Sequence, residues 1–548
     1  MLSRLLDALP PDPLAPRLRR AARALSPSLP ALLRLIVLLL VVVMLLPVGY
    51  LALRAVEGGT SVLEYLARPR TVQIVVNSVA LTASVTLASV AIGVPMAWLT
   101  LCTDLPGRRF WAIAGALPLV IPSYVGAFAL VSAFGPRGLF QQVLEGPLGV
   151  ERLPSIYGFF GAWLALTLFT YPYVFLSVRA GLRGLDPVLM EASRGLGKGG
   201  WRTYWHVTLP QLRPSITGGA LLVALYTLSD FGAVSIMRHD VFTRAIYIQY
   251  GSSFNRSLAA ALALVLVMFT LLIIWGEKRA EGRARFYRSG SGARRAPQRV
   301  RLGRWRWLAV ALLAAVLALA LVAPLLTLGF WLVRGLAAGE VLRDITGPAL
   351  RSLWVSALAA GATGVLSLPV AFLLVRYPSR LNAWLGRLTF VGYALPGVVV
   401  ALALVYFGAR YAPALYQTLP MLVLAYVIRF LPQSVSGTRA SLLQASPRLE
   451  EAARGLGHGA LNVFLNVTLP LVWPGLLSGM ALVFLTTMKE LPATLLLAPI
   501  GFDTLATRIW SATSESFFAR GAAPALLLVA VSALSLGILY AQERRNHT

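Results

Sequence analysis

Residues 186–214 read DPVLMEASRGLGKGGWRTYWHVTLPQLRP, and residues 446–474 read SPRLEEAARGLGHGALNVFLNVTLPLVWP. The two stretches align without a gap and share Glu, Ala, Arg-Gly-Leu-Gly, a further Gly, Val-Thr-Leu-Pro and a final Pro in the same places. Each stretch lies between long apolar runs. A core packed inside lipid has little use for polar, glycine-broken loops of such detail. We therefore expect something in the cytoplasm to recognise both stretches.

The rest of the chain has the composition of a membrane protein. Its 548 residues are 57% hydrophobic and 13% charged, with a mean hydropathy of +0.73. So few polar groups cannot cover the apolar surface in water. Apolar runs of about twenty residues predict an all-α membrane protein with about twelve spanning helices. The candidate spans are 32–54, 73–101, 110–134, 156–181, 215–237, 257–276, 306–333, 350–375, 386–409, 418–440, 474–497 and 521–541.

The formal net charge of +28 is mainly a topology signal. If the chain starts in the cytoplasm and crosses twelve times, most Lys and Arg fall in cytoplasmic segments, as the positive-inside rule requires. This threading places both termini in the cytoplasm. Nucleic-acid binding is not expected, because no aromatic-basic module or zinc-ligand spacing accompanies the charge.

Chemistry carried by cysteine, histidine or a catalytic motif is not expected. Cys102 is the only cysteine, so neither a disulfide framework nor a thiol metal cluster can form. No HExxH motif, nucleophile elbow or catalytic carboxylate pair is evident, so we predict no catalytic residue and no enzyme activity. The four histidines are scattered and predict no metal site: His206, His239, His458 and His547.

The duplication extends beyond the two loops and predicts four segments. Matching positions recur at the same depth in both parts of the chain, so we expect two six-helix repeats of the same hand, related by an axis along the membrane normal. The matching pairs are Asn77-Ser78 with Arg351-Ser352, Ile121-Pro122 with Leu395-Pro396, and Asp230 with Glu490. The predicted segments are a cytoplasmic tail over 1–30, a first half over 31–276, a basic cytoplasmic linker over 277–306 and a second half over 307–548. The linker is expected to anchor topology.

Each repeated loop is predicted to form a short helix lying roughly parallel to the membrane. Asp186 and Ser446 can cap a helix whose first residue is a proline. The helix should end near Gly197 or Gly457, because glycine permits the left-handed turn that stops a helix.

These residues resemble the EAA loop of binding-protein-dependent ABC transporter permeases, and the resemblance covers nearly the whole chain. In that family the loop forms a coupling helix that docks in a groove of the cytoplasmic ATPase. The resemblance implies a type I importer permease in the bacterial inner membrane, with two copies of an ABC ATPase and a periplasmic binding protein as partners. The implied coupling residues are Glu191, Ala192, Ser193 and Gly197 in the first loop, and Glu451, Ala452, Ala453 and Gly457 in the second. Ser193 departs from the family's alanine but stays small.

Two other interpretations of the loop are weaker. The loop could be a capped connector that only orders two spans, but capping does not require the residue identities that both copies keep. Residues 195–200 fit G-x-G-x-x-G, which signifies dinucleotide binding only between a strand and a helix. No G-x-x-x-x-G-K-[ST] phosphate loop occurs, so ATP and Mg²⁺ are expected on a separate chain and no cofactor on this one.

Asp230 and Glu490 are ionisable residues within predicted spans, where a charge is costly. Their equivalent positions in the repeat predict that they approach the shared axis and line a translocation pathway with an acidic character suited to a cation. The alternative is that each pairs with a neighbour, Lys489 or Arg429 being available, and serves packing.

Three stretches resemble the fused ferric-iron permeases of bacterial importers: residues 229–235, 489–497 and 502–510. The resemblance implies Fe(III) as cargo, delivered by the binding protein and moved by alternating access. Permeases for thiamine, polyamines or sulfate share the loop and the repeat, so another small solute is an alternative. An ion-coupled secondary transporter also fits the repeats and buried carboxylates, but it gives no reason for two docking loops.

Overall fold

The computed structural model describes residues 28–185, 193, 195–197, 199–252, 256–280, 300–339 and 345–545. Nearly all of the described chain is helical, and its one β-type pairing is an isolated bridge between Thr103 and Val300. Most of the predicted N-terminal tail and of the predicted basic linker lies outside the described residues.

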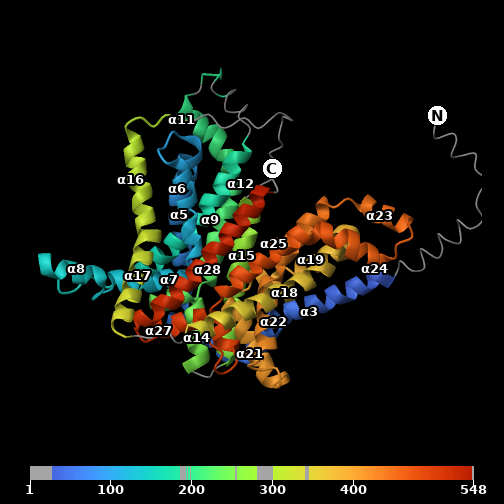
Figure 1. Ribbon diagram of the computed structural model, residues 1–548. Helices are drawn as coiled ribbons and strands as arrows, with labels where there is room; N and C mark the ends of the chain where they lie inside the picture. Colours follow the sequence, from blue (N-terminus) through green and yellow to red (C-terminus); the bar gives the residue numbers. More distant parts are fainter. Residues whose placement is uncertain are drawn as a thin grey trace, which may run out of the picture. The chain divides into compact units, whose positions relative to one another are not determined.

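The helices of the first half follow one another along the chain in Figure 1. They are α3 (Ser28–Glu57), α4 (Gly59–Leu66), α5 (Pro69–Cys102), α6 (Arg108–Ala114), η1 (Leu117–Val120), α7 (Ser123–Phe134), α8 (Leu139–Leu148), α9 (Phe159–Gly184), α11 (Gly200–Thr203), η2 (Tyr204–Thr208), α12 (Leu209–Ser229), α13 (Gly232–Ile236), α14 (Phe242–Ser252) and α15 (Arg256–Ala280).

The second half repeats this order. Its helices are α16 (Trp305–Leu317), η3 (Ala318–Val322), α17 (Ala323–Ala337), α18 (Thr346–Arg376), α19 (Arg380–Leu388), α20 (Val391–Ala394), α21 (Gly397–Tyr411), α22 (Leu419–Gln444), α23 (Pro447–Gly455), α24 (Ala460–Val463), η5 (Phe464–Thr468), α25 (Leu469–Met488), α26 (Pro492–Leu497), α27 (Leu505–Ser514) and α28 (Phe518–Arg545). From α5 and α18 onwards, each main helix of one half has a counterpart in the other.

The helices confirm an all-α membrane protein. Within the described residues, eight helices or continuous helix runs are long and apolar enough to cross a membrane, and two bent helix pairs bring the number to ten. A further apolar helical segment, Phe518–Leu534, is shorter. Each of the twelve predicted spans coincides with one of these helices, with a bent pair, with α12 or with the apolar segment of α28.

The third and ninth predicted spans are not straight. The chain bends by 96° between Arg108–Val120 and Ser123–Leu148, and by 100° between Arg380–Ala394 and Gly397–Tyr411. Both breaks occur at the Ile-Pro or Leu-Pro dipeptide that the repeat shares. Proline has no N–H group and disfavours helical geometry in the residue before it, so the helix ends there and a new one begins.

The fifth and eleventh spans end earlier than predicted. We expected helices through residue 237 and residue 497, but α12 ends at Ser229 and α25 at Met488. The chain then turns through Asp230 or Glu490 and starts a short helix, α13 or α26. An acidic side chain that bonds nearby backbone N–H groups competes with the helix, which the apolar pattern does not reveal.

One turn of π-helix precedes the shared Leu-Pro in each half. These turns are η2 and η5, and Pro210 or Pro470 follows as the second residue of α12 or α25. A proline ring inside a helix collides with the carbonyl group one turn before it, and the wider π turn is a common way to relieve such a conflict.

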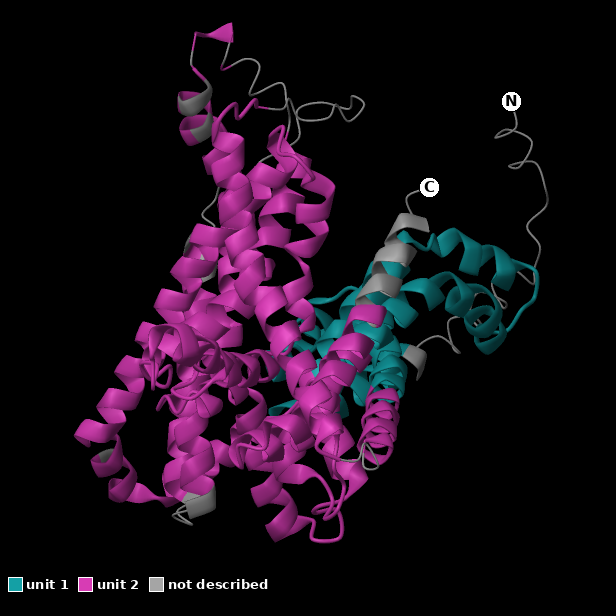
Figure 2. Ribbon diagram, turned by 60° about the vertical axis from the view of Figure 1, so that its left-hand side comes forward, with its two compact units in different colours: residues 1–46, 360–393, 430–483 teal, residues 47–359, 394–429, 484–548 magenta. Residues whose placement is uncertain are grey.

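The described chain divides into two compact units, drawn in different colours in Figure 2. One comprises the described parts of residues 1–46, 360–393 and 430–483, and the other those of 47–359, 394–429 and 484–548. In the larger unit, α5, α9 and α12 pack side by side (Figure 1). Buried aromatic residues such as Phe128, Tyr171 and Phe175 belong to the core of this unit.

Small residues allow close helix packing on both sides of each duplicated loop. In the larger unit, a Cβ atom on Gly219 of α12 would lie 2.8 Å from Cα of Val174 on α9. In the smaller unit, a Cβ atom on Gly479 of α25 would lie 2.8 Å from Cα of Ser434 on α22. Close approach of backbones at small residues is the usual basis of helix association in membranes.

A second close contact occurs in the same helix pairs, and there the glycine and the serine change places between the two halves. Gly181 on α9 faces Ser215 on α12, whereas Ser441 on α22 faces Gly475 on α25. In both pairs one glycine makes room for one serine. The contact is therefore kept although the glycine has moved to the other helix.

We predict that Gly219→Ala destabilises the protein, because the new methyl group meets backbone that cannot rotate away. The expected loss is about 1–3 kcal/mol, typical of overpacking. The adjacent Gly218 is the matched control, since a Cβ atom there meets nothing within 4 Å. Gly218→Ala should leave the melting temperature in detergent unchanged or slightly raised. Equal melting temperatures for both variants would contradict the close packing.

Candidate functional sites: the duplicated loops and the buried carboxylates

The second loop forms the predicted short helix, α23. Pro447 is its first residue, and Ser446 occupies the N-cap position in extended geometry. The Ser446 side chain makes no capping hydrogen bond, so that part of the prediction is wrong. Proline already removes one of the N–H groups that a cap would satisfy, which lessens the need for it.

The end of α23 is a Schellman motif. The N–H of His458 donates to the carbonyl of Ala453 at 3.2 Å, and the N–H of Gly457 donates to that of Arg454 at 3.0 Å. Gly457 has φ +89°, and Gly197 in the first loop has φ +79°. The predicted left-handed turn at a glycine is therefore confirmed in both loops.

The predicted coupling residues of the second loop divide between the two faces of α23. Glu451, Ala452 and Gly457 are exposed, whereas Ala453 is buried. In the first loop, Gly197 is exposed and Ser193 is buried. Glu191 and Ala192 lie outside the described residues.

The structure explains why serine can replace alanine at position 193. Its hydroxyl group lies 3.1 Å from that of Thr203, and both side chains are buried. In the second loop the equivalent positions are Ala453 and Val463, both buried and apolar. A buried hydroxyl needs a hydrogen-bond partner, and Thr203 provides one for Ser193. Ala453 has no hydroxyl, so the apolar Val463 suffices at the equivalent position of the second half.

Sequence reasoning missed the ion pair that anchors the second loop. Glu450 is buried and accepts hydrogen bonds from Nε and Nη2 of Arg376, at the end of α18, at 3.0 and 2.8 Å. Arg376 also donates to the carbonyl of Ala445 at 3.0 Å. The first loop has Met190 at the position of Glu450. A comparison of the two copies therefore could not single out Glu450.

Exposed apolar residues of the loops were missed as well. Leu196 and Leu456 occupy the same position in the two loops, and each is 81% exposed. Trp205 and Leu465 also correspond, and each is 48% exposed. An apolar residue exposed to this extent at the same place in both copies is typical of a contact surface. The sequence could have indicated Leu196 and Leu456, because both copies share Arg-Gly-Leu-Gly.

Asp230 stabilises the break after α12. Its carboxylate accepts hydrogen bonds from the backbone N–H groups of Ala233 at 2.9 Å and Val234 at 3.3 Å, and from the hydroxyl of Ser123 at the start of α7. The hydroxyl of Thr243 donates to the Asp230 carbonyl at 2.6 Å. Asp230 is only 8% exposed.

Glu490 does the same after α25, with a different partner. Its carboxylate accepts a hydrogen bond from the N–H of Ala493 at 3.2 Å and pairs with Arg429 of α22. Gly397, the first residue of α21, takes the place of Ser123. A Cβ atom there would lie 2.6 Å from Glu490 and 2.7 Å from Arg429, so glycine leaves room for the pair.

The buried carboxylates and the basic side chains beside them make contacts within the chain, as the packing alternative expects. Each carboxylate has partners within the chain, and Lys489 reaches the Leu119 carbonyl at 3.3 Å. Two acidic and two basic side chains, those of Asp230, Glu490, Arg429 and Lys489, balance in formal charge. A role in the pathway nevertheless stays a prediction.

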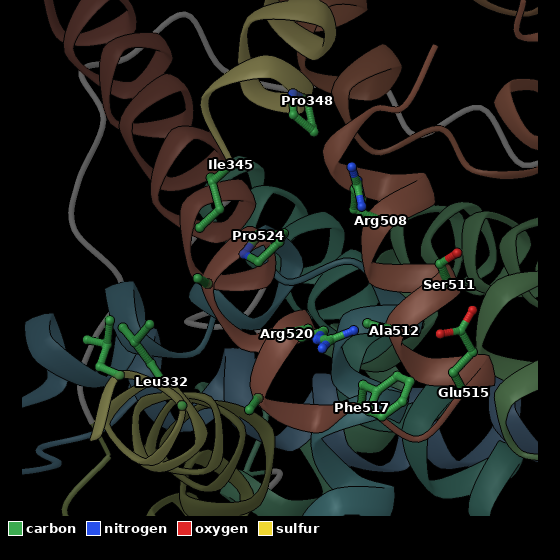
Figure 3. Close-up of a pocket in the computed structure, with 14 residues that line it drawn as sticks. Leu332, Ile345, Pro348, Arg508, Ser511, Ala512, Glu515, Phe517, Arg520 and Pro524 are labelled. Carbon is green, nitrogen blue, oxygen red and sulfur yellow. The ribbon is translucent and has the colours of Figure 1, made fainter. Parts of the chain in front are cut away.

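A pocket of about 350 Å³ with both polar and apolar lining lies elsewhere in the larger unit, among α17, α27 and α28 (Figure 3). Arg508, Ser511, Glu515 and Arg520 contribute its polar lining. No group of three or more His, Cys, Asp or Glu residues suited to a metal ion occurs in the described part of the chain.

We predict that the two carboxylates respond differently to neutralisation. Glu490→Gln leaves the Arg429 charge without its partner and should cost about 3–5 kcal/mol of stability. Asp230→Asn keeps an acceptor for the backbone N–H groups and should cost about 1 kcal/mol. Melting temperatures in detergent measure both. The pathway hypothesis further predicts that folded Asp230→Asn loses uptake, and full uptake by both variants would exclude it.

Comparison with known proteins places the chain among transport components. Residues 107–276 and 363–548 match the family described as binding-protein-dependent transport system inner membrane component, one segment in each half. The Fe(3+)-transport system permease protein FbpB 2 of Haemophilus influenzae is 36% identical over 518 residues, which are 93% of this chain and 98% of that protein.

Relatives of lower identity match a smaller part of this chain. The ferric transport system permease protein FbpB of Actinobacillus pleuropneumoniae is 26% identical over 458 residues, 80% of this chain and 66% of that protein. The molybdenum transport system permease protein ModB of Escherichia coli is 30% identical over 210 residues, 37% of this chain and 90% of that protein.

Proposed function

This chain belongs to the family of binding-protein-dependent transport system inner membrane components, and from that premise we propose that it moves Fe(III) by alternating access coupled through its two duplicated loops. It is a multi-pass inner membrane permease, and ATP hydrolysis belongs to a separate component of the system. In this function Fe(III) is the cargo, and two copies of an ATPase bind the coupling residues of the two loops. Both termini of the chain lie in the cytoplasm.

The observation that carries the coupling proposal is the pair of exposed leucines, Leu196 and Leu456. A leucine held out at the turn after a short helix offers an apolar anchor for a groove on a partner. Glu451 and Ala452, exposed on α23, would line the same contact. The loop repeats once in each half, so one ATPase copy on each loop fits the arrangement.

Force on a loop reaches the spans because the flanking helices are tightly packed. α9 and α12 contact at Gly219 and Gly181, and α22 and α25 contact at Gly479 and Gly475. Cores packed to this density transmit displacement rather than absorbing it. Each loop is therefore expected to move together with its two helices.

We predict that Leu196→Ser with Leu456→Ser lowers binding-protein-stimulated ATP turnover about tenfold, as loss of an interface anchor does. The protein should stay folded, because neither leucine is buried. Leu415→Ser is the matched control, since Leu415 is also exposed but lies in the connection between α21 and α22. Gly457→Val should uncouple too, because φ +89° strains a branched residue. Normal stimulation in the double variant would contradict coupling through the loops.

The iron proposal depends on relatives rather than on a site in this chain. Two relatives carry ferric transport in their names and match 80% or more of this chain. A permease of this kind needs only a route that the released ion can follow.

We predict that cells lacking this protein accumulate less ⁵⁵Fe from a ferric chelate, while uptake of thiamine, polyamine, sulfate and molybdate is unchanged. Expression of the intact chain should restore iron uptake, and the Leu196→Ser, Leu456→Ser chain should not. Selective loss of another solute would replace iron by that solute and leave the coupling proposal standing.

A further inference from the structure

The end of the basic linker is attached to the loop that follows α5. Val300 forms the isolated parallel bridge with Thr103, and its N–H donates to the carbonyl of Cys102 at 2.8 Å. The N–H of Asp104 donates to the carbonyl of Val300 at 3.2 Å. The Asp104 carboxylate in turn accepts the N–H of Leu302 at 2.8 Å. The start of the second half is therefore fixed against the first half at this point.

The bridge brings the starts of α6 and α16 to the same end of the larger unit (Figure 1). The two segments run in the same direction from the bridge, and Arg108 and Trp305, the first residues of α6 and α16, are equally far from it along the chain. The bridge directly follows α5 and shortly precedes Trp305–Ala337, and both of these helices are long and apolar enough to cross a membrane. Their ends at the bridge are therefore expected at the level where the bilayer meets water.

Exposed arginine and aromatic side chains surround this point. Cζ of Arg304 lies 5.8 Å from the ring centroid of Trp305, and Cζ of Arg306 lies 5.3 Å from that of Trp307. A guanidinium group stacked on a ring keeps N–H groups at its edge for an acceptor. We name the exposed side chains here the linker patch, which comprises Arg109, Phe110, Arg301, Arg304, Trp305, Arg306 and Trp307.

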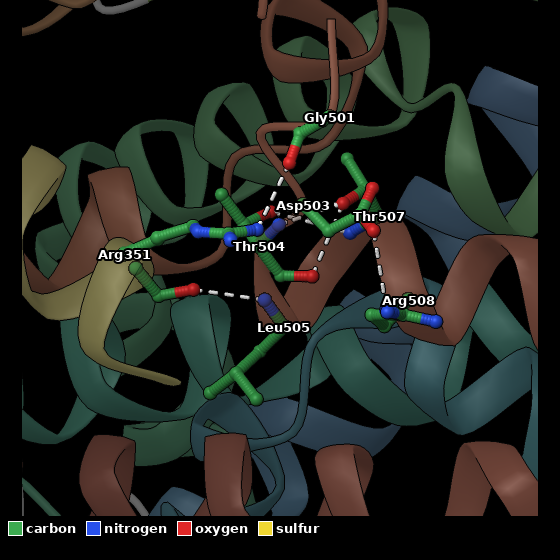
Figure 4. A network of polar contacts seen from close by, with 8 residues as sticks. Arg351, Gly501, Asp503, Thr504, Leu505, Thr507 and Arg508 are labelled. Carbon is green, nitrogen blue, oxygen red and sulfur yellow. Dashed lines mark hydrogen bonds and ion pairs between the residues drawn. The ribbon is translucent and has the colours of Figure 1, made fainter. Parts of the chain in front are cut away.

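The linker patch lacks acidic side chains that would neutralise it. Asp104 is the only acidic residue in 102–114 and 300–310, and its carboxylate already accepts a backbone N–H. Within the described residues, no arginine of the patch forms an ion pair. Arg508, by contrast, pairs with Asp503 at 3.3 Å (Figure 4). The patch is therefore suited to an anion from outside the chain.

Apolar surface continues from the linker patch along α16. Leu308 and Leu312 are one helical turn apart, so they lie on one face, and they are 51% and 59% exposed. A ligand that fits both the arginines and this face has an anionic head and an apolar tail. This combination favours a phospholipid over a free anion or a nucleic acid.

The smaller unit has the same arrangement at the equivalent place. α19 follows α18 as α6 follows α5, and Asn382 on α19 accepts a hydrogen bond from Nε of Arg34 on α3 at 3.2 Å. Trp384 on α19 is exposed, and Cζ of Arg387 lies 5.3 Å from its ring centroid. Each of the two short helices thus presents arginine and tryptophan near the start of the other half's first span.

We propose that the linker patch binds the phosphate group of an anionic phospholipid, whose acyl chains lie along α16. Arginine binds phosphate through parallel N–H groups, and tryptophan favours the boundary between headgroups and hydrocarbon. A zwitterionic lipid would bring a positive group to a patch that is already basic. The bound lipid contacts α6 of the first half and α16 of the second, so it holds together the two segments that the bridge joins. The lipid belongs to the cytoplasmic leaflet, which rests on the proposed orientation of the chain.

Photoactivatable phosphatidylglycerol tests the site on the purified full chain in detergent. We expect cross-links to α6 and the start of α16, and separately to α19. Arg109→Gln with Arg306→Gln should lower the yield at the linker patch about tenfold, because each arginine near the headgroups contributes to binding of anionic lipid. The yield at α19 should not change. Arg70→Gln with Arg334→Gln is the matched control, since it removes two exposed arginines from the opposite ends of α5 and Trp305–Ala337.

Competition and a conservative variant complete the test. Unlabelled phosphatidylglycerol in excess should abolish the cross-link and phosphatidylcholine should not, while Arg109→Lys with Arg306→Lys should keep most of the yield because the charge is kept. Equal yields in the glutamine variant and its control, equal competition by phosphatidylcholine, or displacement by inorganic phosphate would each overturn the lipid site. An unchanged cross-link with loss of the co-purified ATPase would assign the patch to a protein instead. The lipid measurements use neither iron nor ATP, so they fail or succeed independently of the proposed transport function.

Discussion

The structure depends on a constraint that lipid imposes: a spanning helix can break only where side chains satisfy the backbone groups that the break exposes. Asp230 and Glu490 meet this constraint. Each carboxylate accepts backbone N–H groups at the start of the next short helix and also binds the start of α7 or the Arg429 side chain beside the start of α21. Asp230 thereby connects the broken third and fifth spans of one half, whereas Glu490 connects the eleventh span of the other half to the tenth, which carries Arg429. These contacts help to fix α13 and α26, the short helices that follow the two breaks.

The two halves satisfy the same constraints with different residues. Where Ser123 bonds Asp230, Gly397 instead clears space for an arginine to reach Glu490. The buried hydroxyl pair of Ser193 and Thr203 corresponds to the apolar pair Ala453 and Val463. In each case both members of a contact differ together, because changing one alone would leave an unpaired polar group or a collision. The two halves therefore share the position of each contact, although the residues that make it differ.

Much of the fold could be predicted because it follows from local signals. Apolar runs marked the spans, the Leu-Pro and Ile-Pro pairs recurred in both halves, and glycine at 197 and 457 predicted the turn that ends each loop helix. The early ends of α12 and α25 were missed, because hydropathy reports burial and not helix continuity. Arg376 and Glu450 were missed because their contact is long-range and is present in one half only. Leu196 and Leu456 stood at the same position of the repeat, but the sequence alone could not show that both side chains are exposed.

The same contacts suggest how a push on a loop becomes a change at the axis. α12 begins within the first duplicated stretch and ends just before Asp230, and α25 begins within the second and ends at Met488, so one helix in each half joins the end of a loop to a helix break. Tight packing at Gly219 and Gly479 couples each of these helices to its neighbour. The carboxylate after the far end bonds to the short helix beyond the break and to a neighbouring span, α7 in the first half and α22 in the second. Under the proposed coupling, we expect movement of a loop to reach Phe231 or Leu491, the residues that directly follow the two carboxylates.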